Sequence, residues 1–361
     1  MTTRPPPTNL LYAARPTIFI DERENPALSA GLLTMRIEEN EEGLAHCELT
    51  FGNWGTTGGE VGFLYFDRAL LDFGRTISIT AGDGDAQAEI FRGRISALEG
   101  RFPQQRPPEL TIFAEDALQA LRMTRRTRVF EEMSDGEIVE RIAGEHSLQH
   151  NVSLSGPTHS AIAQLNQSDL AFLRERVRAV GGVLWVEDQT LFAAPLAERD
   201  AGTVELTYGQ RLLEFTALAD LAHQRTAVHV HGWDEQAKTS ISATGRTTAL
   251  SADLSGKTGG FDLLEEAFGA REEHLVHHAA ATQAAVDALA DAAAVRTARR
   301  FVRGRGVCEG DGRIRVGAHL KLNEIGVMFE GVYDVVEVRH TFDGVEGYRT
   351  AFVVERPAIG A

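Results

Sequence analysis

Histidines are the residues of this chain best suited to bind a metal ion. His274 and His278 stand four positions apart, with His277 beside the second, so a helix would place the outer two on one face. A zinc protease motif needs Glu directly after its first His, and Leu275 stands there instead. We therefore expect these three to be surface histidines.

A second pair, His229 and His231, alternates along a predicted strand, so both side chains share a face. The pair fits either two metal ligands or a pH-sensitive packing contact. Because no third ligand is near in the sequence, we favour a partly exposed face of a β-barrel.

Other patterns associated with catalysis are incomplete. Residues 251–258 read SADLSGKT and end like a phosphate-binding loop, but Ser251 replaces the first required glycine and no apolar strand precedes it. The chain has no Gly-x-Ser-x-Gly motif, and its 52 carboxylates form no constellation that identifies a general acid. We predict that the protein is not an enzyme and has no catalytic residue, cofactor or metal. The tryptophans are expected to be core or interface anchors: Trp54, Trp185 and Trp233.

The composition indicates a folded protein of several domains. Its 361 residues exceed one typical core, and 43% are hydrophobic. A net charge of -16 argues against nucleic-acid binding, which needs Lys and Arg to replace phosphate counterions. Cys47 and Cys308 are far apart and are predicted to be buried free thiols. We see no secretion signal and no apolar run of about 20 residues, so we expect a soluble protein that inserts into no membrane.

The first part of the chain is rich in strands. Residues 1–15, with Pro5-Pro6-Pro7, are predicted to form a loose arm. Residues 16–115 contain about six short apolar runs that are separated by polar or glycine-bearing turns. This spacing predicts a small antiparallel β-barrel.

Residues 116–202 are predicted to form an α/β middle domain, because the hydrophobic period there rises to 3.6. Short helices are expected at 116–121 and 134–143, the second with Ser134 as its N-cap and Glu137 completing a capping box. A longer helix follows within 164–182, capped by Ser168 and ended by a glycine pair, and 183–192 predict a hairpin.

Strand patterns return at 203–235 and at 301–358, and we expect them to form one second β-barrel. Between them, 236–300 are predicted to be an insertion that ends in an Ala-rich helix. Near the end, Tyr333–Arg339 alternate imperfectly between apolar and charged residues. Asp343-Gly344 predict a tight hairpin turn, because Asp-Gly tolerates positive backbone angles.

Two stretches carry a resemblance to a known family. One holds GVYDVVEVRH at 331–340 and GYRT at 347–350; the other is the Ser-Asp, Phe-Leu, Arg and glycine-pair pattern of 164–182, followed by an aromatic strand. Both resemble the phage late control D family, the baseplate hub proteins of contractile tails and injection systems, which are similar to the N-terminal part of VgrG spike proteins. Val177 departs from the expected Leu but keeps the helix face apolar. The resemblance covers about residues 16–357.

The resemblance implies a mainly β fold with α/β insertions, in which two similar small β-barrels flank a helix-containing middle domain. It implies a homotrimeric, pseudo-sixfold ring that adapts the hexameric inner tube, or a tube-initiator protein, to a trimeric spike formed by a separate chain. Such a hub also contacts other baseplate components, assembles in the cytoplasm and becomes part of a phage tail-like particle. We expect the contact loops at 52–59 and 256–260. The alternative is a β-domain protein that binds or degrades cell wall or glycan.

Overall fold

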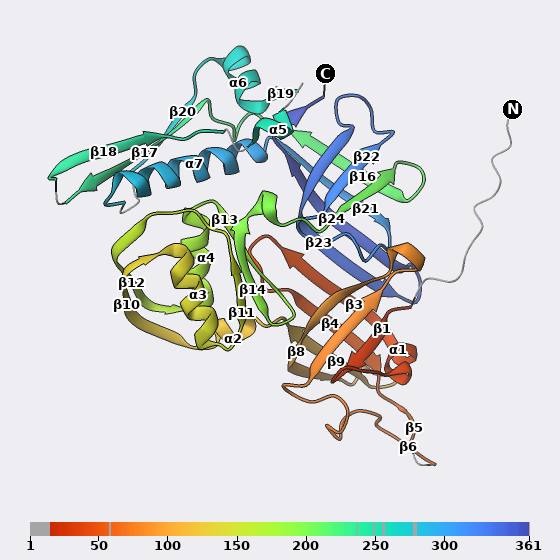
Figure 1. The fold of residues 1–361 in the computed structure, drawn as a ribbon. Coiled ribbons are helices and arrows are strands. Elements are labelled where there is room, and N and C mark those ends of the chain that lie inside the picture. Colours follow the sequence, from red (N-terminus) through yellow and green to blue (C-terminus); the bar gives the residue numbers. More distant parts are fainter. Residues whose placement is uncertain are drawn as a thin grey trace, which may run out of the picture.

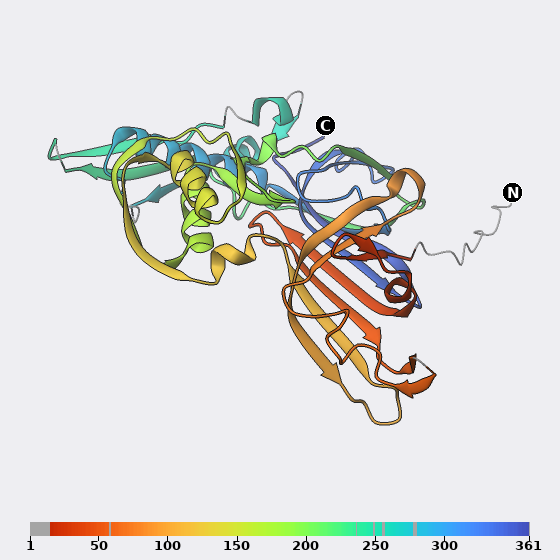
Figure 2. The same cartoon turned by 60° about the horizontal axis from the view of Figure 1, so that its bottom comes forward.

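The protein is described here by a computed structural model of residues 15–57, 59–235, 237–247, 250–254, 257–276 and 280–360. The loose N-terminal segment predicted at 1–15 lies outside these residues except for Arg15. The chain is mostly β, with large antiparallel sheets, as expected. Figures 1 and 2 show the large sheet on one side of the molecule, with the helical middle domain and a long helix on the other.

The first unit of the large sheet comes from the N-terminal part of the chain. Its strands run in the spatial order β3-β4-β9-β8-β7-β1-β2. Helix α1 (Pro26–Gly31) connects β2 to β3, and Asn25 caps it by accepting a hydrogen bond from Leu28 N–H. The short pair β5 (Gly55–Thr57) and β6 (Glu60–Gly62) extends from the sheet at the bottom of Figure 1. The strand bounds are β1 (Thr17–Ile20), β2 (Arg23–Glu24), β3 (Leu32–Asn40), β4 (His46–Gly52), β7 (Thr76–Ala81), β8 (Ala88–Arg101) and β9 (Glu109–Glu115).

Residues 227–299 form a separate part of the molecule, which we call the arm. The second unit of the large sheet combines strands that precede and follow the arm in the sequence. Its order is β16-β21-β24-β23-β22-β15, and a two-residue strand, β25 (Ala358–Ile359), follows it and pairs with β19 (Thr258–Gly259). The strand bounds are β15 (Thr203–Thr207), β16 (Leu212–Ala219), β21 (Val302–Glu309), β22 (His319–Asn323), β23 (Gly331–Asp343) and β24 (Gly347–Arg356).

The two units repeat one strand topology. If five strands of each unit are numbered in chain order, both units have the spatial order 1-2-5-4-3: β3-β4-β9-β8-β7 and β16-β21-β24-β23-β22, antiparallel throughout. Two β-bulges also coincide. One adds Leu33 to β3 and Leu213 to β16; the other adds Ser96 to β8 and Val336 to β23. A shared topology with shared bulges makes the units structural repeats.

The bulge at Val336 explains the imperfect alternation seen in the sequence. Tyr333 and Val335 are buried before it, whereas Val338 and Phe342 are buried after it, because one extra residue exchanges the faces of the strand. The hairpin that follows is present, but its left-handed residue is Gly347 (φ 71°) and not Gly344. The prediction of a tight Asp-Gly turn is wrong in this detail: the Asp343 carboxylate instead accepts hydrogen bonds from Val345 and Glu346 N–H.

Pairing between β3 and β23 joins the units into one 13-stranded sheet. Among the described strands, the ladders do not close either unit into a barrel, and the strand outside each five differs: β1 is antiparallel to β7, but β15 is parallel to β22. Each unit has its own hydrophobic core, and Phe342 and Tyr348 of the second unit pack into the core of the first. The two units are therefore packed together as neighbours.

The middle domain lies between them in the sequence. Its helices begin at Ser134, with the predicted capping box, and at Ser168, which accepts a hydrogen bond from Ala171 N–H. The first short helix, α2, is Gln119–Arg122, slightly later than predicted. Further elements are β10 (Arg125–Ser134), α3 (Asp135–Glu145), β11 (Gln149–Val152), β12 (Thr158–Ser168), α4 (Asp169–Ala179), β13 (Gly182–Glu187) and β14 (Thr190–Pro195).

The arm begins earlier than the sequence suggested. Strand β17 (Ala227–Asp234), predicted to lie in the second barrel, pairs with β18 (Thr239–Thr244) and β20 (Glu272–Leu275) in a separate sheet. Val228 and Val230 are buried against alanines of helix α7 (Gln283–Arg299), which the Ala-rich segment forms. The small alanine side chains of α7 allow this burial, and for this reason β17 belongs to the arm and not to the second unit. Helices α5 (Ser251–Leu254) and α6 (Gly260–Phe268) lie between β18 and β20.

Candidate functional sites

An exposed aromatic cluster lies where β5 and β6 leave the first unit. It consists of Trp54, Phe63, Phe66 and Phe102, whose rings are in contact at centroid distances of 5.0 to 6.2 Å. Trp54 is 48% exposed, Phe63 49% and Phe102 66%. Contiguous exposed aromatic side chains are typical of interaction surfaces.

Buried Asn53 holds this cluster in place. Its side-chain oxygen accepts hydrogen bonds from the backbone N–H groups of Leu64 (2.9 Å) and Tyr65 (2.8 Å). The loop of Trp54 is thereby fixed against the segment of Phe63, so that the surface is preorganised. The loop 52–59 was expected from the sequence, whereas Phe63, Phe66 and Phe102 were not. Three aromatics within Phe63–Phe66 are the signal that was available.

The SADLSGKT segment does not have the structure of a phosphate loop. Such a loop follows a strand and leads directly into a helix. Here the segment begins in helix α5, and Thr258 lies in β19, which pairs with β25 at the C-terminal end. Part of the segment, Ser255 and Gly256, lies outside the described residues. The predicted contact loop at 256–260 is thus, where described, paired with another segment of the chain.

Three of the candidate histidines come together in the arm. Parallel pairing of β17 with β20 places His229 opposite His274, and their rings stack at 4.8 Å. His231 Nε2 lies 3.0 Å from His274 Nδ1. His274 is therefore in a strand and not in the helix considered above, while His277 and His278 lie outside the described residues. Only the fold reveals this proximity, because 43 residues separate His231 from His274.

The remaining candidate residues are structural. Cys47 and Cys308 are free and fully buried, as predicted, and burial raises the pKa of the Cys308 thiol to about 12. Trp185 is buried and stacks on Phe192, whereas Trp233 is exposed. None of the described helices is both long enough and apolar enough to span a membrane.

The fold defines a class of protein. Over 95% of its length the chain matches the 43 kDa tail protein of prophage MuSo2 from Shewanella oneidensis, with 98% of that chain covered, a TM-score of 0.66 and 10% identity. A tail protein from Neisseria meningitidis MC58 matches similarly, with 96% and 97% coverage, a TM-score of 0.65 and 12% identity. The chain has the fold of phage tail proteins.

A third structure extends the fold to secretion systems. The E. coli c3393 protein, described as a component of the type VI secretion system with structural similarity to the T4 tail proteins gp27 and gp5, matches with a TM-score of 0.54 and 11% identity. The match covers 94% of this chain and 74% of that one. In sequence, the family model described as the Alg8 N-terminal domain matches residues 32–344, and the chain belongs to this family. Comparison with curated protein sequences gives no match.

Proposed function

We propose that the protein is the central hub of the baseplate in a contractile injection system or phage-like tail. In this role three copies form a pseudo-sixfold ring that joins a hexameric inner tube to a trimeric spike formed by a separate chain. The role is structural, without catalysis, and belongs to a particle assembled in the cytoplasm. The observation that carries the proposal is the repeated strand topology of the two units within a tail-protein fold.

Internal repetition supports a change of symmetry. Three copies of a chain with two like units present six similar units, so one ring is compatible with a sixfold tube on one face and a threefold spike on the other. The units share two bulges as well as their strand order, so their sheets twist alike at corresponding places.

Two exposed surfaces fit the contact between neighbouring copies. The aromatic cluster projects from the first unit, while β16 of the second unit pairs with β21 on one side and exposes Leu213 (45%) and Leu218 (61%). The first surface is aromatic, and the second presents its two leucines beside exposed Glu214 and Thr216. A heterologous contact, with the first unit of one copy against the second unit of the next, closes into a ring.

The test measures the mass of the purified full chain by light scattering. We expect a trimer for the wild type and a monomer for the triple variant Trp54→Ala, Phe63→Ala and Phe102→Ala, with an unchanged circular dichroism spectrum. Leu218→Ser, on the opposite surface, should also prevent assembly. A matched control replaces large exposed side chains away from both surfaces, Met123→Ala with Phe268→Ala, and should remain trimeric.

A wild-type chain that stays monomeric when mixed with its tube and spike proteins would contradict the hub role. A trimer that survives both surface variants would contradict the assigned contact while leaving the hub role in place.

A further inference from the structure

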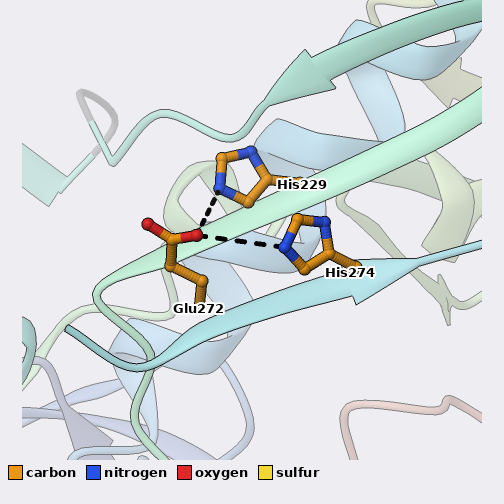
Figure 3. Close-up of side chains that lie close together, drawn as sticks. All are labelled: His229, Glu272 and His274. Carbon is orange, nitrogen blue, oxygen red and sulfur yellow. Dashed lines mark ion pairs between the residues drawn. The ribbon is translucent and has the colours of Figure 1, made fainter.

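We propose that His229, Glu272 and His274 bind one divalent transition-metal ion of the zinc class on the outer face of the arm. Figure 3 shows the Glu272 carboxylate beside the two imidazoles, with one oxygen facing both rings. The site is independent of the ring assembly proposed above.

The three ligand atoms already converge. Glu272 Oε2 lies 3.6 Å from His229 Nε2 and 3.9 Å from His274 Nε2, and all three ligand atoms lie within 4.8 Å of one another. Imidazole nitrogen and carboxylate oxygen are ordinary zinc ligands. In the described part of the chain, this is the one group of three or more His, Cys, Asp or Glu side chains with such proximity.

The fold sets this geometry through strand pairing. β17 and β20 are parallel, with His229 opposite His274, and Glu272 is two residues before His274 on the same strand face. Val228 and Val230, which alternate with the histidines, pack on α7 and hold β17 in place. The ligand face is thus opposite the buried face, accessible to ions from solvent.

The Nδ1 atoms of His229 and His274 have hydrogen-bond partners that favour metal binding at Nε2. His229 Nδ1 lies 3.0 Å from the Thr244 hydroxyl, and His274 Nδ1 lies 3.0 Å from His231 Nε2. A proton on each Nδ1 can be donated to these partners, which leaves both Nε2 atoms free to bind a metal. His231 acts as an acceptor that orients His274, and Thr244 does the same for His229.

The distances require only side-chain adjustment. Zinc–nitrogen bonds of about 2.0–2.1 Å place two ligands of a tetrahedral ion roughly 3.4 Å apart. Both carboxylate–imidazole distances are within about half an ångström of this value. The imidazoles stack at 4.8 Å with an interplanar angle of 18°, so they must rotate until both ring planes meet at the ion. Three protein ligands leave a fourth position for water or another ligand.

Metal binding would fasten β20 to β17. These strands share four residue pairs, from Ala227 opposite Glu272 to Val230 opposite Leu275. A ligand that binds only the folded arm stabilises it by mass action, so zinc should raise the melting temperature.

The experiment uses the full chain after treatment with EDTA and dialysis. Calorimetric titration with ZnCl2 should show one ion bound per chain, and Co²⁺ should give the intense visible absorption of a four-coordinate site. His229→Ala, His274→Ala and Glu272→Gln should each lower the zinc affinity by more than about 100-fold, and Thr244→Val by about 10- to 100-fold.

The matched control is His150→Ala. His150 Nδ1 lies 3.9 Å from Glu140, and both side chains are exposed. Among the described residues, this pair is not part of a group of three possible metal ligands. The His150→Ala variant should bind zinc with the affinity of the wild type. Melting temperatures in EDTA establish that each variant is folded. Failure of the wild type to bind zinc, or equal affinity in folded His229→Ala and His274→Ala variants, would overturn the proposal.

Discussion

The two units of the large sheet share their strand order and two bulges but differ in what their connections carry. In the first unit, the connection from β4 to β7 carries three of the four aromatic residues of the cluster, Trp54, Phe63 and Phe66; in the second, the connection from β16 to β21 forms the arm with its histidines. The bulges set the twist and the buried face of the strands, so they are retained where the connections diverge. Sheet geometry and surface function are therefore carried by different parts of each unit.

Equivalent positions also differ in chemistry. The register around the shared bulge aligns Gly100 of β8 with His340 of β23, since Gly100 is opposite Leu110 and His340 is opposite Thr350. His340 is fully buried, and Tyr348 Oη and Thr350 Oγ1 lie 2.8 and 3.1 Å from its Nδ1. One unit has a buried titratable group where the other has no side chain.

The largest effect should come from deleting a shared bulge residue. Deletion of Val336 exchanges the faces of the strand beyond it, so that Val338, His340 and Phe342 leave the core. We expect insoluble or unfolded protein, measured as soluble yield and circular dichroism. Deletion of Ser96 should be milder, because the residues after it, such as Glu99 and Gly100, are exposed.

Deletion of Val345, which is 94% exposed in the hairpin loop, serves as the control and should leave the protein folded. If the Val336 deletion folds like the wild type, the bulge does not determine the register.

A smaller effect should follow from breaking the buried ion pair between the first unit and Arg199, in the segment that leads into the second unit. Glu39 on β3 pairs with Arg199 and accepts a hydrogen bond from Val316 N–H of the second unit. Burial alone would raise the pKa of Glu39, but Arg199 and Arg315 hold it below its usual value. Glu39→Gln leaves the Arg199 charge, which is 4% exposed, without compensation and should lower the free energy of unfolding by about 3–5 kcal/mol.

Chemical denaturation measures that loss. Glu205→Gln is the comparison, because the Glu205–Lys321 pair within the second unit is exposed and should leave stability almost unchanged. Equal effects of the two substitutions would show that Glu39 does not connect the units.

The second unit should also contribute to the pH dependence of stability. Burial lowers the pKa of His340 from 6.5 to about 4. Between pH 6.5 and about pH 4, His340 therefore binds a proton in the unfolded chain but stays neutral in the folded chain. Stability falls as the pH falls through this range. The shift corresponds to about 3 kcal/mol at most. His340→Gln should lower the slope of the plot of unfolding free energy against pH between 7 and 4; an unchanged slope would exclude a contribution from His340.

For the smallest effect, we expect no difference between the two units in the labelling rate of their buried cysteines. Cys47 on β4 and Cys308 on β21 are buried, one in each unit on the second of its five strands, and burial raises the pKa of both thiols. Single Cys→Ala variants report one thiol each. We expect equal, slow labelling rates, because a continuous sheet unfolds as a whole. Much faster labelling of one thiol would mean that its unit opens independently.

Local patterns in the sequence predicted the individual elements well. Ser134 with Glu137 and Ser168 predicted two helix starts, because capping depends on neighbouring residues alone. The second unit was harder to delimit: the strand at 227–235 has the composition of a sheet strand, but its partner, α7, lies more than 50 residues later. Its sheet could not be assigned from local pattern.

The same distinction applies to the candidate sites. The sequence alone determined the strand-rich plan, the buried cysteines and the exposed loop near Trp54, since composition and period are properties of short segments. Tertiary structure alone decided that β3 pairs with β23, which strand order and bulges the two units share, and that His229 meets Glu272 and His274. These depend on register between distant strands, which many pairings of similar apolar patterns would satisfy until the whole core is packed.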